Sequence, residues 1–304
     1  DCRWNKKSQR VEVKAEADDI GLAHTLIEGY YAPGNKYIDM NIGAQNTDLH
    51  FLNKWTSVVF KELGGKATGN LRIYGSLPKL DMEGEAILEN GYFQQTAINT
   101  TFLVKHDTLW FEPGKMLFKD VEFYDENGHD GIMTCILTHD HFADWRVDMS
   151  ADVANMLVYN QLESDKSNFH AKVYAEGSMT LTFTPQDGLA VYVDARTAPG
   201  TRLGFQPSSG SVADYNFITF VDRNEVNINE EIISSIIPQQ QKKNGKQNRF
   251  TLDFDIKCSE DALIDMSISS LTGFFRGNGR VSFKFTPQDG PILNGIYNLS
   301  YGQC

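Results

Sequence analysis

Apolar and polar residues alternate along most of this chain, so that one side of strand after strand is predicted to be apolar. The clearest stretches are residues 146–153, where valine, methionine and alanine alternate with polar residues, and 179–184, where Met179, Leu181 and Phe183 alternate with threonine. This two-residue period is typical of half-buried strands. The same pattern recurs at Val11–Ala15, Leu252–Ile256, Ile264–Ile268 and Val281–Phe285. The pattern predicts an all-β protein whose strands share one long apolar face.

Turn signals support this prediction. Asn-Gly pairs, which supply the positive φ angles of tight hairpins, begin at residues 90, 127, 244, 278 and 294. The sequence Phe-Thr-Pro-Gln-Asp-Gly occurs at 183–188 and again at 285–290, each time after an alternating stretch. We interpret both copies as strand-turn-strand units, which are either a true repeat or a coincidence of local turn preference.

Two segments break the alternation, and the sequence predicts one or two short amphipathic helices, with a third candidate further along the chain. In residues 47–63, Leu49, Leu52, Trp55, Val59 and Leu63 follow helical spacing before two glycines, which predicts an amphipathic helix. Weaker helical patterns cover 20–30 and 229–237. We expect these short helices to plug or cap the sheet.

Composition and charge narrow the function classes. The chain has 304 residues, 41% of them hydrophobic, and a formal net charge of -12, which argues against nucleic acid as a partner. Its one basic cluster, Lys242, Lys243, Lys246 and Arg249, lies in a polar stretch that we interpret as a loop. No apolar run approaches the roughly 18 residues of a membrane-spanning helix, and we interpret the chain as a fragment of a longer protein. The four cysteines show no metal-like spacing, which favours free, mostly buried thiols.

The strongest catalytic candidate is residues 138–144, where His139 and His141 stand in H-x-H spacing before Asp144. This resembles the H-x-H-x-D-H zinc signature of metallo-β-lactamase-fold hydrolases, but Asp144 lies one place too late and Trp145 stands where the third histidine would follow. The alternative is a hairpin tip at the lip of the apolar face. We favour that alternative, and expect no enzyme, no metal site and no cofactor.

The order of several blocks resembles the C-terminal region of the TamB translocation and assembly module family, a group of AsmA-like, bridge-like lipid transfer proteins. The blocks are residues 65–80, 84–93, 118–121, 125–128, 137–142, 169–177, 195–201, 275–279 and 294–297. Phe169-His170 replaces the Tyr-Gly usual in the family, and 222–248 reads as a variable insertion. The resemblance implies an elongated, curved antiparallel or mixed sheet, folded as a β-taco or open groove with an apolar interior.

The resemblance also implies a place and partners. Such proteins are anchored in the inner membrane by an N-terminal helix, absent from this fragment, and span the periplasm. The implied partners are phospholipid acyl chains and an outer-membrane barrel assembly protein of the TamA/BamA type. On this basis we divide the chain into N-terminal strands with the amphipathic helix (1–63), a groove segment (64–205), a variable insertion (206–250) and continuing strands (251–304).

Distributed apolar residues are the expected lining of this groove, since each buried methylene contributes roughly 0.8 kcal/mol. They are Leu71, Ile73, Val147, Met149, Leu181, Phe183, Val191, Val193, Phe254 and Phe283. Two alternatives remain. The same faces would close on each other in a structural or carbohydrate-binding β-sandwich, with Tyr30, Tyr31, Trp110 and Tyr124 available to a sugar. A metal-dependent hydrolase would use His139 and His141.

Overall fold

The protein is one long sheet of strands. The computed structural model describes residues 1–19, 23–57, 60–161, 169–205, 249–268 and 271–303. The first nine strands are β1 Cys2–Asn5, β2 Arg10–Asp19, β3 Ala23–Ala32, β4 Tyr37–Asp48, β5 Phe60–Ser76, β6 Lys79–Gln95, β7 Thr100–Glu112, β8 Lys115–Asp125 and β9 Asp130–Asp140. They are followed by β10 Ala143–Gln161, β11 Phe169–Thr184, β12 Gly188–Thr197, β13 Arg202–Phe205, β14 Phe250–Cys258, β15 Leu263–Ile268, β16 Leu271–Thr286 and β17 Gly290–Gln303. The predicted all-β class is confirmed.

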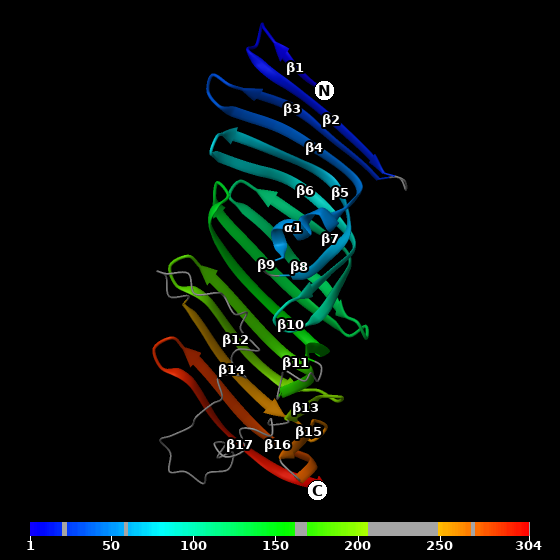
Figure 1. Ribbon diagram of the computed structural model, residues 1–304, viewed down its shortest axis with the longest axis vertical. Helices are drawn as coiled ribbons and strands as arrows, with labels where there is room; N and C mark the ends of the chain where they lie inside the picture. Colours follow the sequence, from blue (N-terminus) through cyan, green and yellow to red (C-terminus); the bar gives the residue numbers. More distant parts are fainter. Residues whose placement is uncertain (20–22, 58–59, 162–168, 206–248, 269–270, 304) are drawn as a thin grey trace.

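Strands β1 to β11 pair in chain order, each antiparallel to the next. Strand β11 then pairs with both β12 and β13, which run parallel to β14 and β15, and β16 pairs antiparallel with β14, β15 and β17. The described ladder therefore runs from β1 at one end of the molecule to β17 at the other, as Figure 1 shows. The ladder is continuous across the predicted domain boundary between residues 63 and 64, because both residues lie within β5. The division of the chain into domains stays a prediction.

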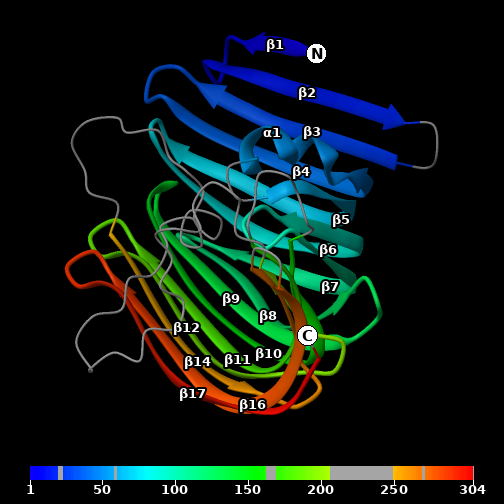
Figure 2. The same cartoon turned by 60° about the horizontal axis from the view of Figure 1, so that its bottom comes forward.

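The sheet curves into a trough over its C-terminal strands (Figure 2). Interruptions in neighbouring strands lie side by side: β12 and β13 are separated by 198–201, and β14 and β15 by 259–262. A backbone hydrogen bond links the first residue of β15 to the break between β12 and β13, with the Leu263 amide donating to the Thr201 carbonyl at 2.9 Å. Bulges in β10 and β16 accompany the two breaks. Bulges and breaks bend strands, so the sheet folds along the line that passes through 198–201 and 259–262, which we call the fold line.

A hydrophobic core fills the trough beside β7, β8 and β10, where the sheet curls far enough for β10 to contact β7 and β8. Its buried members are Phe102, Val104, Val121, Phe123, Ala151 and Met156. The ring centroids of Phe60, Phe93, Phe102 and Phe123 follow one another at 5.5, 5.4 and 5.5 Å. Buried apolar side chains thus fill the concave side of the sheet where β7, β8 and β10 meet, and we call them the dry core.

One predicted helix is much shorter than expected, and a second is wrong. The described residues of 47–63 form a 3-10 turn, Leu49–Leu52, and one helical turn, α1 Asn53–Thr56, and β5 begins at Phe60. Within 20–30, the described residues from Ala23 belong to β3, which pairs with β2 and β4. In both segments strand pairing outweighs the helical spacing of the apolar residues. The third predicted helix, 229–237, and most of the basic cluster lie outside the described residues.

The repeated hexapeptide makes the same turn twice. Thr184 and Asp187 exchange hydrogen bonds of 2.9 and 3.0 Å between β11 and β12, and Thr286 and Asp289 do so at 3.0 and 2.9 Å between β16 and β17. Of the Asn-Gly pairs that the structure describes, only the one at 127 lies in a hairpin turn. Those at 90, 278 and 294 lie inside β6, β16 and β17.

Candidate functional site

All ten predicted lining residues lie on described strands and are half-buried. Register brings most of them together: Met149 is opposite Leu181, which is opposite Val191, and Val193 is opposite Phe254. Phe254 in turn is opposite Phe283, while Val147 is opposite Phe183. Because directly opposed residues share a face, these side chains form continuous rows across β10, β11, β12, β14 and β16.

The other two, Leu71 and Ile73, lie on β5 beyond the dry core and extend the same face. They are opposite Ile42 and Met40 of β4. Residues that were not predicted connect the two groups through successive opposed pairs: Gly69 of β5 with Ala86, Ala86 with Leu109, Leu109 with Phe118, Phe118 with Cys135, and Cys135 with Met149. The apolar face therefore continues from β4 to β16. Among described elements, substantial packing outside the strand ladder is confined to the short helices against β5 and to β10 against β7 and β8.

The opposite face of the sheet is charged. Arg72 donates to Asp39 at 2.8 and 3.0 Å and to Glu83 at 3.0 Å, and the hydrogen bonds from Arg72 lower the pKa of the Asp39 carboxyl. Arg280 likewise pairs with Asp255 on the neighbouring strand, which lowers the pKa of that carboxyl. The two faces thus differ sharply in polarity along the ladder.

The histidine pair lies at a hairpin tip, as the favoured alternative predicted. The His139 ring is 9% exposed and lies 4.6 Å, centroid to centroid, from the rings of Phe142 and Trp145. Its Nδ1 accepts a 2.9 Å hydrogen bond from the Phe142 amide, and burial lowers its pKa. His141 lies 3.1 Å from Asp81 instead. In the described ranges no group of three or more His, Cys, Asp or Glu residues is arranged to hold a metal.

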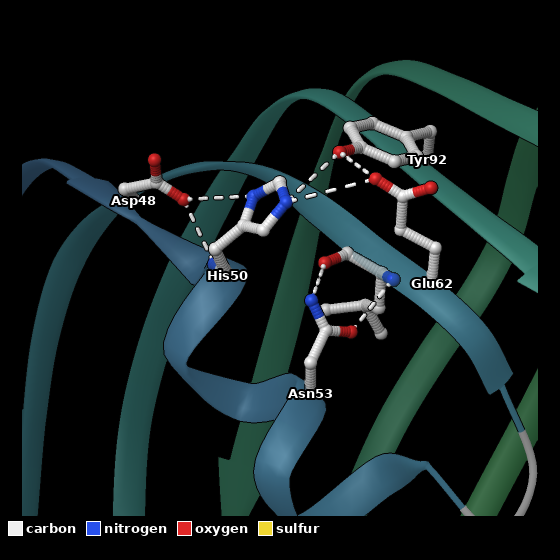
Figure 3. Close-up of polar contacts among 6 residues, drawn as sticks. Asp48, His50, Asn53, Glu62 and Tyr92 are labelled. Carbon is white, nitrogen blue, oxygen red and sulfur yellow. Dashed lines mark hydrogen bonds and ion pairs between the residues drawn. The ribbon is translucent and has the colours of Figure 1, made fainter.

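A polar cluster fastens the short helical segment to β5 (Figure 3). The Asn53 side chain accepts from the Leu63 amide and donates to the Leu63 carbonyl, both at 2.8 Å, and so replaces a strand partner where β4 has ended. His50 lies between Asp48 and Glu62, 3.4 and 3.7 Å away, and the Tyr92 hydroxyl donates to Glu62 at 3.1 Å.

Three cysteines are free thiols within the described residues. Cys2 is exposed, contrary to the expectation of mostly buried thiols, while Cys135 and Cys258 are half-buried. Cys304 lies outside the described residues. Burial, followed by the charge of Asp148, raises the pKa of Cys135 to about 11, and burial also raises that of Cys258.

Comparison with known families decides the assignment. The family model for the TamB C-terminal domain matches residues 119–304, more than half of the chain. The chain belongs to the TamB family. The predicted resemblance is confirmed, and with it an envelope protein of a transport and assembly family. Searches of curated proteins and of solved structures return no match. None of the described helices has the length and apolar character needed to cross a membrane.

Proposed function

We propose that the apolar face is a groove along which phospholipid acyl chains pass between the inner and outer membranes. The observation that carries this proposal is the half-buried apolar face whose opposed residues continue from β4 to β16. Residues of a closed core would be buried, whereas Leu181, Val193 and Phe283 keep part of their surface accessible. An acyl chain would cover that surface, with a gain of roughly 0.8 kcal/mol for each methylene.

Passage along such a face needs no catalytic group. The contacts are non-directional and similar from strand to strand, so a chain that moves by one row loses and gains comparable area. The family assignment supports a periplasmic segment, and we extend this to a full-length protein with an N-terminal inner-membrane anchor. The dry core beside β7 and β10 covers part of the face, and we propose that the acyl chain passes it along the row of Leu137, Val147 and Phe183.

The test is native mass spectrometry of the purified chain, coupled to lipid extraction, with Leu181→Asp as the variant and Thr182→Asp as its matched control. Both residues lie on β11, but Thr182 is exposed on the other side of the strand. We expect phospholipid to co-purify with the native chain and with Thr182→Asp, and to be lost from folded Leu181→Asp. Lipid-free native protein, or a Leu181→Asp chain that unfolds while Thr182→Asp does not, would instead indicate a closed core.

We propose a second function, assistance to outer-membrane protein assembly, on the basis of the family assignment. In this proposal the apolar side chains of β17 contact a barrel assembly protein of the TamA/BamA type. The most exposed of them are Ile296 (72%), Leu299 (64%) and Tyr301 (59%). Binding of that protein from the same organism should weaken in an Ile296→Lys, Leu299→Lys variant and persist in Thr182→Asp.

A further inference from the structure

A polar pocket of about 500 Å³ lies away from the apolar rows. It is lined by Asn127 and His129 from the turn between β8 and β9, by Lys172 and Tyr174 of β11, by Pro199 and Gly200 of the strand break, and by Arg202 of β13. Lys172 and Tyr174 have even numbers in β11, whereas the apolar row residues Met179, Leu181 and Phe183 have odd numbers. The pocket is therefore on the outer side of the fold line.

A buried carboxylate holds one wall of this pocket. Asp125 is fully buried and accepts four hydrogen bonds, from the amides of Leu157 (2.7 Å), Asn127 (2.8 Å) and His129 (2.9 Å) and from His129 Nδ1 (2.9 Å). These bonds fix the turn and orient the His129 ring with Nδ1 toward Asp125. Because Asp125 is surrounded by donors, its charge is already compensated within the wall.

The facing wall is equally well fixed. The buried Thr201 hydroxyl accepts from the Tyr174 amide at 3.1 Å and lies 2.9 and 2.8 Å from the carbonyl oxygens of Tyr174 and Ala198. Asn127 crosses the pocket and donates to the Tyr174 hydroxyl at 3.2 Å. Both walls are thus preformed, which lowers the conformational entropy lost when a ligand binds.

The charge in the pocket is unbalanced. Lys172 and Arg202 are exactly opposed in register on β11 and β13, and neither forms an ion pair with a described residue. Like charges directly opposite each other on a sheet are destabilising. Acidic residues outnumber Lys and Arg by 40 to 28 in the whole chain, yet none of the residues that line the pocket is acidic.

We propose that this pocket binds a phosphate group. Arg202 would supply a planar fork of donors and Lys172 a point charge, and His129 would add a donor at Nε2 in its doubly protonated form, because Nδ1 is directed at Asp125. An oxyanion between the two cations relieves their repulsion, and the volume leaves room for the substituent of a phosphate ester. The phosphate belongs either to a phospholipid headgroup or to a soluble ester, and the inference does not depend on the apolar groove.

The test compares Lys172→Gln, Arg202→Gln with a control of equal charge change, Lys119→Gln, Arg146→Gln, whose residues are also exposed. Glycerol phosphate is titrated calorimetrically at low ionic strength, and flotation is measured with vesicles of phosphatidylglycerol diluted in phosphatidylcholine. We expect the pocket variant to lose at least tenfold in affinity and the control less than twofold. Circular dichroism and the thermal midpoint establish that both variants are folded.

The two binding measurements, calorimetry with glycerol phosphate and flotation with vesicles, identify the source of the phosphate. Loss of vesicle binding alone assigns a lipid headgroup, and loss of glycerol phosphate binding alone assigns a soluble ester. If the native chain binds neither probe, or if both variants weaken binding equally, the pocket is not a phosphate site and the proposal is wrong. Neither result bears on co-purification of lipid with the apolar face.

Discussion

The side-chain amide of Asn99 donates a 2.8 Å hydrogen bond to the backbone carbonyl of Asn160, 61 residues further along the chain. The Asn160 amide in turn donates to the carbonyl of Ile98 at 2.9 Å. Together these bonds join the turn between β6 and β7 to the end of β10, and so close the trough over the core that contains Phe102 and Met156. The trough is therefore closed where the end of β10 meets the turn between β6 and β7. The apolar rows that contain Met149 and Leu181 remain half-buried.

Asn99→Gly tests this closure. Glycine tolerates the positive φ of 50° at residue 99, so the change removes the hydrogen bond without adding backbone strain. We expect the free energy of unfolding to fall by about 1 kcal/mol, with faster amide exchange at Asn160. Asn155→Gly is the control, because Asn155 has a similar φ of 52° and is exposed. Equal losses in both variants would show that the contact contributes nothing specific.

Asp125→Asn tests the buried carboxylate. Burial raises the pKa of Asp125, but the hydrogen bonds from Leu157, His129 and Asn127 outweigh it and the net pKa is lowered. A carboxylate with a lowered folded pKa stabilises the protein above its unfolded value of about 4, and that contribution is lost as pH falls through the folded value. We expect the variant to be about 1.5–3 kcal/mol less stable at pH 7.

The difference between Asp125→Asn and the native chain should begin to shrink below about pH 4, where the unfolded carboxyl takes up a proton. It should be lost in full only as pH falls through the lowered pKa of the folded carboxyl. Urea denaturation at pH 7, 5, 4 and 3 measures it, with exposed Asp152→Asn as the control. A difference that is the same at every pH would indicate that the lost packing, not the charge, causes the destabilisation.

Alternation in the sequence was sufficient to predict the strands and the face they share, because side-chain direction in a strand depends only on parity. It failed where the strands have bulges. In β10 the register shifts between Val153 and Met156, and in β8 between Phe118 and Val121. Each shift changes which parity faces inward, so the core residues Met156 and Val121 fell outside the predicted pattern.

The outer pocket had no signal of this kind in the sequence. Its walls come from residues 127–129, 172–174 and 199–202, which the fold line brings together. No local spacing relates them. In the sequence, residues 125–128 carry only an Asn-Gly turn signal and one block of the family resemblance. The Asn-Gly pairs inside β6, β16 and β17 show that strand pairing can override turn chemistry.

Gly177→Ala tests the close packing of β11 against β12. Gly177 has a φ of 149°, and a methyl group there would meet the Asp194 carbonyl oxygen and lie 2.6 Å from the Ala195 Cα atom. Backbone cannot move aside as a flexible side chain can, so we expect a loss of about 1–3 kcal/mol in the free energy of unfolding. Ser178→Ala, on the exposed side of the same strand, should change it by less than about 0.5 kcal/mol. A native-like denaturation midpoint for Gly177→Ala would mean that the two strands separate easily here.

Thiol reactivity tests whether the apolar face is closed to water around Cys135. This residue is opposite Met149 in the rows, and its pKa of about 11 leaves roughly one thiol in a thousand ionised at pH 8. We expect iodoacetamide to modify exposed Cys2 much faster than Cys135, as measured by mass spectrometry of the digested chain over time. Asp148→Asn should accelerate the reaction of Cys135 only modestly, because burial is the larger cause of its raised pKa. Urea should abolish the difference between the two cysteines. If Cys135 in the native chain reacts as fast as Cys2, water enters this part of the face freely, and an acyl chain there would have to displace it.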